Sequence, residues 1–265
     1  MGIVELQGLT RRFATVTAVD DLTLSIDAGE VFGLLGPNGA GKTTTIKMLT
    51  TLLPPSAGHA RIDGRDVVRE AASVRRLIGY VPQMLSADGT LTGFENLLVF
   101  AKLYELPTQD RRRLVREALE FMGLADSADK LVRQYSGGMI RRLEIAQSLL
   151  HSPRVLFLDE PTVGLDPNAR RAVWSHIGEL RKRLGVTIIL TTHQMEEADA
   201  LCARVAIMHK GKMVVLDRPN TLKGSIGRPG ATLDDVFIHF TGANLDDGGS
   251  YRDTRRTRRS ARRLG

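Results

Sequence analysis

The sequence predicts an α/β protein built around a mostly parallel sheet, and three observations lead to this prediction. Segments rich in valine, isoleucine and leucine alternate with segments that repeat apolar residues at helical spacing. A glycine-rich loop, GPNGAGKT at 36–43, joins one of these strands directly to a helix. Strand patterns are missing from 84–150, which indicates a helical subdomain inserted into the α/β framework.

The elements before the insertion begin with an antiparallel pair that predicts an N-terminal β subdomain. Strands are expected where short apolar or alternating runs end in glycine, proline or aspartate, at 3–9, 18–26, 31–36, 59–64 and 78–83. Amphipathic spacing predicts helices at 42–53 and 66–77. Pro54 and Pro55 end the first of these helices.

The inserted subdomain and the elements after it follow from the same rules. Helices are expected within the insertion at 92–106, 108–124 and 137–150. Buried strands are expected at 154–160 and 186–193, with a hairpin over 204–217 that turns at Lys210 and Gly211. Helices are expected over 168–185 and 231–242.

Composition places the chain among ordinary globular proteins, with 42% hydrophobic and 25% charged residues. Its longest apolar runs, such as VTIIL, are far shorter than the roughly 20 residues of a membrane span. The N-terminus shows no apolar signal segment, and the single cysteine, Cys202, forms no internal disulfide. We therefore expect a cytosolic protein.

The net charge of +7 is concentrated at the C-terminus. The last fifteen residues hold seven arginines and one aspartate, so the preceding 250 residues are nearly neutral. The body thus predicts no specific nucleic-acid-binding surface. We interpret 243–265 as a disordered basic tail, and two other readings stay open: attraction to an anionic membrane leaflet, or loose binding of nucleic acid.

The glycine loop predicts a phosphate site. Its glycines let successive backbone N–H groups turn toward phosphate oxygens, and the following helix adds its positive N-terminal end. Lys42 supplies a charge for the β and γ oxygens, and the Thr43 hydroxyl is a ligand for Mg²⁺. The alternative is a glycine-rich turn with a chance lysine. The predicted nucleotide-binding residues are Gly36, Pro37, Asn38, Gly39, Ala40, Gly41, Lys42, Thr43 and Thr44.

Two adjacent carboxylates end the predicted strand RVLFLDE. Asp159 is expected beside the glycine loop, where it binds Mg²⁺ through water, and Glu160 is placed to polarise the attacking water. Both side chains could instead cap the following turn, where Pro161 keeps Glu160 extended. The apolar run that leads into them favours the functional interpretation.

His193 and Gln83 each follow a predicted strand at the same edge of the sheet. A neutral imidazole there can hydrogen-bond a γ-phosphate oxygen or hold the attacking water. The Gln83 amide can reach Mg²⁺ or water at the point where the helical insertion begins. The alternatives are a structural histidine and a solvated loop glutamine.

Six motifs in order, GPNGAGKTT, VPQ, YSGGM, VLFLDEP, GLD and TTH, together resemble the nucleotide-binding subunit of an ABC transporter. The resemblance covers residues 3 to about 222. It implies a P-loop NTPase that binds ATP and Mg²⁺ and hydrolyses ATP. The implied roles are the Walker A loop at 36–44, the Q-loop glutamine Gln83, the Walker B pair Asp159 and Glu160, the dimer-coupling Asp166 and the switch histidine His193.

The resemblance also explains a second, lysine-free anion site. Ser136, Gly137 and Gly138 begin a predicted helix, and in the family this signature contacts the γ-phosphate held by a second subunit packed head to tail. Tyr135 and Met139 replace the leucine and glutamine that usually flank these residues. The residue that stacks on the base is Phe13 where the family usually has tyrosine, so stacking keeps the ring face and loses the hydroxyl.

The segment ATLDDVFIHFTG and the SGGM signature are similar to exporter ATPases of the daunorubicin-resistance type. This likeness implies a homodimer that drives a separate transmembrane permease, is peripheral on the cytoplasmic face of the membrane, and exports a drug, antibiotic or lipid-like compound. We expect an ATPase domain at 1–222 and a short helical extension at 223–242. The alternative is a soluble ABC ATPase acting on nucleic acid or ribosomes, but those groups carry two cassettes or long insertions.

Overall fold

A computed structural model of the protein describes residues 2–242, and its strands form two sheets. One sheet has four strands in the order β2-β1-β4-β5, and the other has six in the order β10-β9-β3-β8-β7-β6. The predicted tail at 243–265 lies outside the described residues. The α/β fold, the antiparallel N-terminal subdomain and the helical insertion are all present, as the sequence predicted.

The six-stranded sheet positions the functional edge of the molecule. Strands β6, β7, β8, β3 and β9 are parallel, and β10 pairs antiparallel with β9. Their carboxyl ends therefore meet along one edge, where ligands of such sheets bind. The bounds are β3 Val31–Leu35, β6 Ile78–Val81, β7 Val155–Asp159, β8 Thr187–Thr192, β9 Arg204–His209 and β10 Lys212–Asp217.

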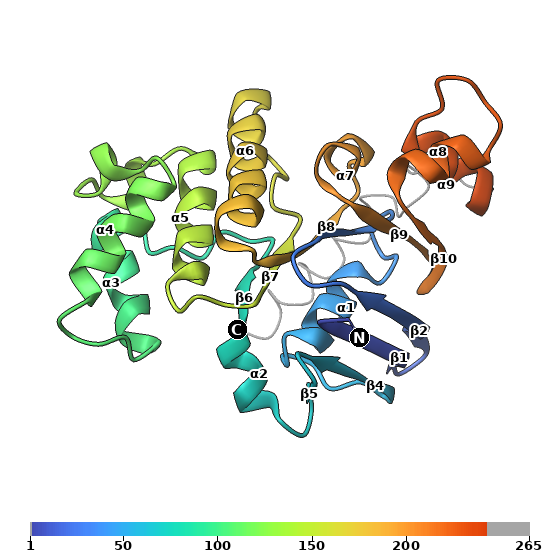
Figure 1. The fold of residues 1–265 in the computed structure, drawn as a ribbon, viewed down its shortest axis with the longest axis horizontal. Helices are drawn as coiled ribbons and strands as arrows, with labels where there is room; N and C mark the ends of the chain where they lie inside the picture. Colours follow the sequence, from blue (N-terminus) through green and yellow to red (C-terminus); the bar gives the residue numbers. More distant parts are fainter. Residues whose placement is uncertain (1, 243–265) are drawn as a thin grey trace, which may run out of the picture.

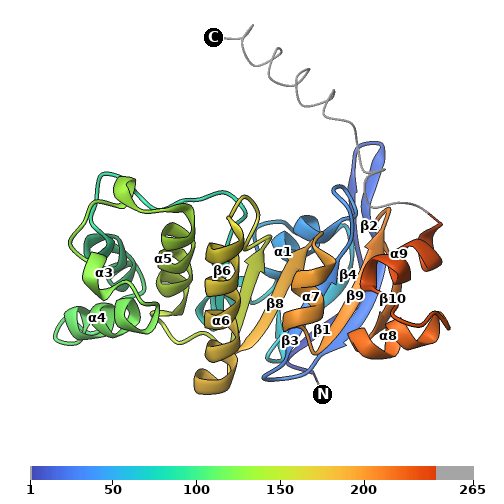
Figure 2. The same cartoon turned by 90° about the horizontal axis from the view of Figure 1, so that it is seen from above.

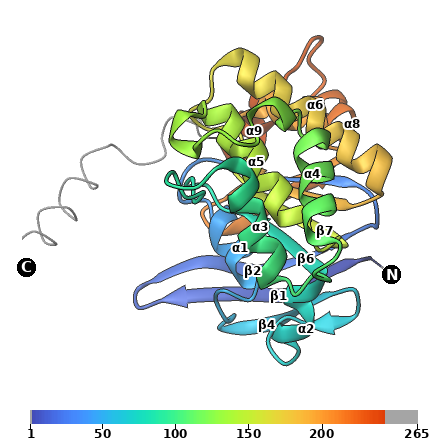
Figure 3. The ribbon, with the colours of Figure 1, turned by 90° about the vertical axis from the view of Figure 1, so that its left-hand side faces the viewer.

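The antiparallel sheet packs with helix α1 against one face of the larger sheet (Figure 3). Successive side chains of the parallel strands point to opposite faces of the six-stranded sheet. On one face, Phe32, Phe157 and Ile189 belong to the core shared with the antiparallel sheet. Their neighbours Leu35, Leu158 and Leu190 join the core beneath the remaining helices. The bounds are β1 Val4–Phe13, β2 Val16–Ile26, β4 Ala57–Ile62, β5 Arg65–Asp66 and α1 Lys42–Leu49.

Helices α3, α4 and α5 form the inserted subdomain at one end of the molecule, and α8 and α9 lie at the other end (Figures 1 and 2). Helix α6 begins where Asp166 accepts from the backbone N–H of Asn168 and Ala169, and it ends at Gly185 with φ 63°. The bounds are α3 Gly93–Leu103, α4 Arg111–Phe121, α5 Gly137–Leu149, α6 Pro167–Leu184, α7 Met195–Leu201, α8 Pro219–Ser225 and α9 Leu233–Thr241, with 3₁₀ turns at Ala125–Ser127 and Val132–Gln134.

Some local features differ from the sequence interpretation, while the expected domain boundary at residue 222 stays a prediction. The helix expected over 66–77 begins only at Ala71, because the Asp66 carboxylate accepts from the N–H of Val68 and Arg69 and forms a turn. The short helices α7 and α8 were not predicted, since seven residues are too few to establish a helical period. Residue 222, the expected end of the ATPase domain, lies within α8.

The contact between α5 and the edge strand β6 requires a glycine. A Cβ on Gly79 would lie 2.5 Å from the carbonyl oxygen of Ser148, whereas a Cβ on Gly178 in α6 meets nothing within 4 Å. We expect Gly79→Ala to destabilise the protein by about 1–3 kcal/mol, because helix and strand must separate. The matched variant Gly178→Ala is expected to stabilise it by about 0.5–1 kcal/mol through helix propensity. Denaturant unfolding of both variants measures these changes, and equal effects at the two positions would contradict the packing argument.

Candidate functional site

The glycine loop connects β3 to α1 in a conformation that demands glycine. Gly36 has φ 147° and Gly41 has φ 105°. A Cβ on Gly36 would lie 2.2 Å from the carbonyl oxygen of Met208, and one on Gly41 would lie 2.4 Å from that of Ala18. The loop therefore passes against the start of β2 and the end of β9, and side chains at these two positions would open it.

Lys42 extends back across the loop that precedes it. Its Nζ donates to the carbonyl oxygens of Gly36 at 2.7 Å and Pro37 at 3.2 Å. The same atom lies 3.1 Å from Oε1 of Glu160, and both side chains are about 95% buried. The loop thus holds the buried ammonium group of Lys42 directly against the carboxylate of Glu160, which follows β7.

Asp159 is the last residue of β7 and is buried. Its Oδ1 accepts from the hydroxyl of Thr43 at 3.1 Å and from that of Thr191 at 2.5 Å. The structure therefore brings together the hydroxyl and carboxylate that the sequence assigned to Mg²⁺. Thr191 on the neighbouring strand fixes the orientation of the carboxylate.

Glu160 is the central residue of the site. Its backbone has φ 51°, in place of the extended geometry expected before Pro161, and its N–H donates to the carbonyl of Thr191. Its Oε2 lies 2.7 Å from Nδ1 of His193. Burial favours a raised pKa for Glu160, but the hydrogen bond from His193 and the charge of Lys42 outweigh it, so this pKa lies below its usual value. The hydrogen bond to Glu160 in turn raises the pKa of His193, against the opposing effect of burial.

Lys42, Thr43 and Glu160 line a cavity of about 520 Å³ at the sheet edge, whereas Asp159 and His193 contact these residues without lining it. Gln83 reaches it from the segment after β6, and Lys210 reaches it from the turn between β9 and β10. The lining residues are Val16, Thr17, Ala18, Pro37, Asn38, Gly39, Ala40, Gly41, Lys42, Thr43, Thr44, Gln83, Glu160 and Lys210.

Phe13 lies at the end of β1, close in sequence to the residues of β2 that line the cavity. Its side chain is 42% exposed, and the guanidinium of Arg11 lies 4.6 Å from the ring centre. Phe13 itself is not among the lining residues of the described chain. The ring keeps one face for stacking, since Arg11 covers the other.

The signature residues lie at the start of α5, and the residues that line the cavity of the described chain do not include them. The Ser136 hydroxyl accepts from the N–H of Met139 at 3.3 Å, and both Ser136 and Gly137 are exposed. A Cβ on Gly138 would lie 2.8 Å from that of Ala169, so glycine allows α5 to approach α6. This helix N-terminus is therefore exposed and lies outside the cavity at the chain's own glycine loop, as far as the described residues show.

Tyr135 replaces the usual leucine of the signature and is buried. Its hydroxyl donates to the carbonyl oxygen of Ser127, and a Cβ on Gly93 would lie 2.2 Å from that hydroxyl oxygen. The tyrosine therefore packs inside the helical subdomain and leaves Ser136 unobstructed. Asp166, assigned to dimer coupling, caps α6 through its Oδ1.

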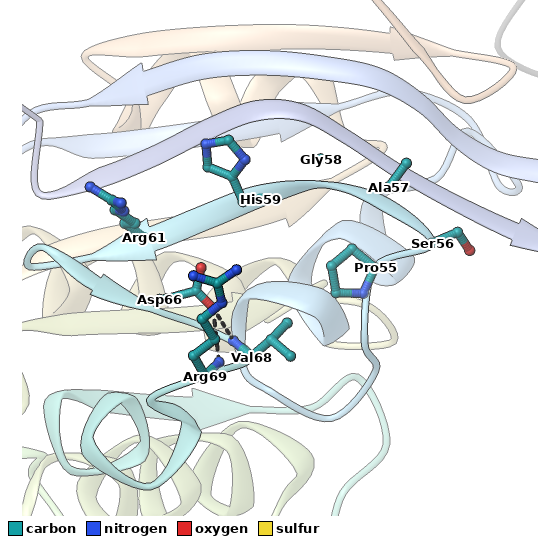
Figure 4. Close-up of a pocket in the computed structure, with 9 residues that line it drawn as sticks. All are labelled: Pro55, Ser56, Ala57, Gly58, His59, Arg61, Asp66, Val68 and Arg69. Carbon is teal, nitrogen blue, oxygen red and sulfur yellow. Dashed lines mark hydrogen bonds between the residues drawn. The ribbon is translucent and has the colours of Figure 1, made fainter.

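A second cavity, of about 450 Å³, lies on the antiparallel sheet (Figure 4). His59 and Arg61 contribute from β4, Asp66 from the end of β5, and Val68 and Arg69 from the turn that follows it. None of its lining residues belongs to the predicted site. It is a surface hollow separate from the nucleotide edge.

Two features of the site were missed from the sequence. Thr191 lies near the end of β8, two residues before His193. Residues two apart in a strand point to the same face, and this spacing was the signal in the sequence that could have identified Thr191. Glu197 in the short helix α7 is 1% exposed and accepts from the hydroxyl of Thr162 at 2.7 Å and the indole N–H of Trp174 at 2.9 Å. It joins α7 to the segment after Glu160, and the sequence carried no pattern that indicated this.

A glycine loop that joins β3 to a helix and a carboxylate pair at the end of β7 together indicate an ATP-hydrolysing enzyme of the P-loop class. A sequence model described as ABC transporter matches residues 19–163. The chain belongs to the ABC transporter family and is an ATP-binding subunit that hydrolyses ATP.

The curated relatives agree with this assignment over most of the chain. The daunorubicin/doxorubicin resistance ATP-binding protein DrrA of Streptomyces peucetius is 45% identical over 224 residues, which are 84% of this chain and 68% of the relative. The Nod factor export ATP-binding protein I of Burkholderia thailandensis is 45% identical over 219 residues, 83% of this chain and 72% of the relative.

Two solved structures share the fold at 29% identity. One is the ATP-binding subunit of an ABC transporter, with a TM-score of 0.79 over 90% of this chain and 99% of the other. The second is cbiO1 from Clostridium perfringens, part of the ABC transporter complex cbiONQ, with a TM-score of 0.77 over 85% and 92%. Within residues 2–242, every helix is too short or too polar to cross a bilayer.

The contact between Thr191 and Asp159 yields a test of the site. Thr191→Val removes, at nearly constant volume, a hydroxyl that donates to Asp159 and accepts from the N–H of Glu160, and we expect the kcat of ATP hydrolysis to fall about tenfold or more as both residues lose their orientation. Nucleotide affinity, measured with a fluorescent ATP analogue, should change much less. Thr187→Val is the control, because Thr187 lies at the opposite end of the same strand and accepts only from the N–H of Gly29. Equal losses in the two variants would contradict the assigned role.

Proposed function

We propose that the protein is the ATPase subunit of an ABC exporter and hydrolyses ATP at two sites shared between two copies of the chain. One observation carries this proposal. The cavity at the glycine loop contains Lys42 and Glu160, while the anion-binding start of α5 is exposed and lies outside that cavity. A head-to-tail pair of chains would place Ser136 of each copy against the nucleotide of the other, which completes both sites.

Within each site, the residues have distinct tasks. The loop amides and Lys42 bind the β and γ phosphates, and Glu160 accepts a hydrogen bond from the attacking water and orients it. His193 fixes the carboxylate of Glu160 through the hydrogen bond to Oε2. Closure of the pair excludes bulk water, which strengthens each of these electrostatic interactions.

The same edge fits Mg²⁺. Thr43 and Asp159 present hard oxygen atoms 3.1 Å apart, and Gln83 lines the same cavity. Within residues 2–242, no group of three or more His, Cys, Asp or Glu side chains is placed to hold a metal ion. When bound, Mg²⁺ neutralises charge that develops on the phosphates. Asp159 would bind it through water, while Thr43 and Gln83 would bind it directly.

Export and a separate permease are supported by the relatives. Their names describe drug resistance and Nod factor export, and neither refers to a ribosome or nucleic acid. The non-transport alternative is therefore not favoured. We infer that the subunit docks on a transmembrane permease at the cytoplasmic face of the membrane, and that the cargo is a drug, antibiotic or lipid-like compound.

The shared-site arrangement is tested by trapping it. Glu160→Gln keeps the shape of the side chain but removes the charge that supports hydrolysis, so ATP should hold two copies together. Size-exclusion chromatography with light scattering should show a dimer with Mg²⁺ and ATP and a monomer with ADP. A variant that stays monomeric when saturated with ATP would sink the proposal.

The contribution of the signature is tested in two backgrounds. Ser136→Arg fills the exposed helix start, so it should abolish the trapped dimer when combined with Glu160→Gln and the steady-state ATPase activity when introduced alone, while a single chain still binds ATP. Ser225→Arg is the matched control, because Ser225 is also exposed but lies at the end of α8. Retained turnover in the Ser136 variant would show that this serine acts at no nucleotide site.

The exporter assignment is tested by recruitment to the membrane. Co-expression with a permease of about six membrane spans encoded beside the gene should move the protein into the membrane fraction and allow its release by detergent with the permease. Cells that express the ATPase without a permease are the control. A protein that stays soluble with each neighbouring permease would contradict the transport role.

A further inference from the structure

Helix α5 carries a buried ion pair that the steps above do not use. Nη1 of Arg141 lies 3.0 Å from Oε2 of Glu144, and both side chains are 2% exposed. By contrast, the comparable pair on α4, Arg113 with Glu117, has both side chains more than half exposed. A buried pair on a helix is costly to desolvate, so its position calls for an explanation.

Both members of the pair also bind the segment that contains Gln83. Arg141 donates from Nη1 to the carbonyl oxygen of Pro82 and from Nη2 to that of Gln83, each at 2.7 Å. Glu144 accepts at Oε1 from the backbone N–H of Ser86 at 2.5 Å and from its hydroxyl at 3.1 Å. Arg141 therefore holds one end of the segment at 82–86, and Glu144, about one turn further along α5, holds the other end.

The direction of these bonds explains why charged groups are used. The segment offers carbonyl oxygens at one end and an N–H with a hydroxyl at the other, so it needs a donor and an acceptor. Arginine presents two parallel N–H groups, which fit two successive carbonyls. An apolar pair would fill the same volume and would leave residues 82–86 without this attachment.

The attachment joins two functional elements. Ser136 caps the start of the helix that carries Arg141, and Gln83 projects into the cavity of the glycine loop. Helix α5 lies between α3 and α4 on one side and α6 on the other (Figures 1 and 2). A shift of Gln83 is therefore carried to the body of α5 through short, buried bonds.

We propose that Arg141 and Glu144 are positioning residues that couple the segment at 82–86 to α5, so that contact of Gln83 with the nucleotide in one site orients Ser136 toward the nucleotide of the other. This inference rests on the proposed function, because it assumes that Gln83 and Ser136 serve two different sites. Neither Arg141 nor Glu144 is among the described residues that line the cavity at the glycine loop.

The test replaces the pair with apolar residues of similar size, Arg141→Met with Glu144→Leu. Such replacements commonly leave stability unchanged or raise it, so the melting temperature should not fall. We expect the kcat of ATP hydrolysis by the full chain to fall about ten- to a hundredfold, with the affinity of a single chain for a fluorescent ATP analogue changed less than about twofold. Arg113→Met with Glu117→Leu is the control on α4, and its kcat should match the unmodified chain.

A mutant cycle separates positioning from a structural role. Gln83→Ala and the apolar pair should each lower kcat, and their combination should lower it no further than the more severe of the two. A folded apolar variant with normal kcat, or losses that multiply in the combined variant, would overturn the proposal. If the apolar pair does not fold, Glu144→Gln removes the charge at constant shape and is judged by the same two criteria.

The dimerisation of the Glu160→Gln variant distinguishes a failure of the shared-site function from a failure of the coupling by Arg141 and Glu144. If Glu160→Gln never dimerises with ATP, the shared-site function itself is wrong. If Glu160→Gln dimerises and the same variant with the apolar pair dimerises at equal ATP concentration, the function stands and the coupling by Arg141 and Glu144 is wrong.

Discussion

The site depends on a contact among three side chains at the carboxyl edge of the parallel sheet. Lys42 binds one oxygen of the buried Glu160 carboxylate, and His193 binds the other. Burial alone would favour a neutral carboxyl, and the hydrogen bond from His193 with the charge of Lys42 reverses that preference. A carboxylate kept ionised and fixed in direction is what orientation of a water molecule requires. The lysine of the glycine loop, the Glu160 carboxylate and His193 are therefore one electrostatic unit.

Sheet topology brings this unit together. The chain places the three residues far apart, yet β3, β8 and β7 are neighbours in the sheet and run parallel. Crossover connections return each strand to the same edge, so residues just beyond the strand ends converge. Thr191 on β8 orients Asp159 on β7 across one strand spacing, which ties the residues assigned to Mg²⁺ to the same edge.

The inserted subdomain carries the second surface that the proposed function uses. Its helix α5 approaches α6 closely at Gly138 and carries the exposed Ser136 at its start. Arg141 and Glu144 bind this helix to the segment that leaves β6. The catalytic edge and the signature are thereby parts of one connected structure, although each serves a different nucleotide in the arrangement that we propose.

The sequence by itself determined the α/β class, the helical insertion and the residues of the glycine loop, because strand and helix periods and the GPNGAGKT spacing are local signals. It did not reveal α7, the turn at Asp66, or the buried contacts of Glu197 and Arg141. Each of these depends on which distant backbone atoms lie within hydrogen-bonding distance. Only the tertiary packing decides that, since a single buried donor or acceptor leaves no period in the chain.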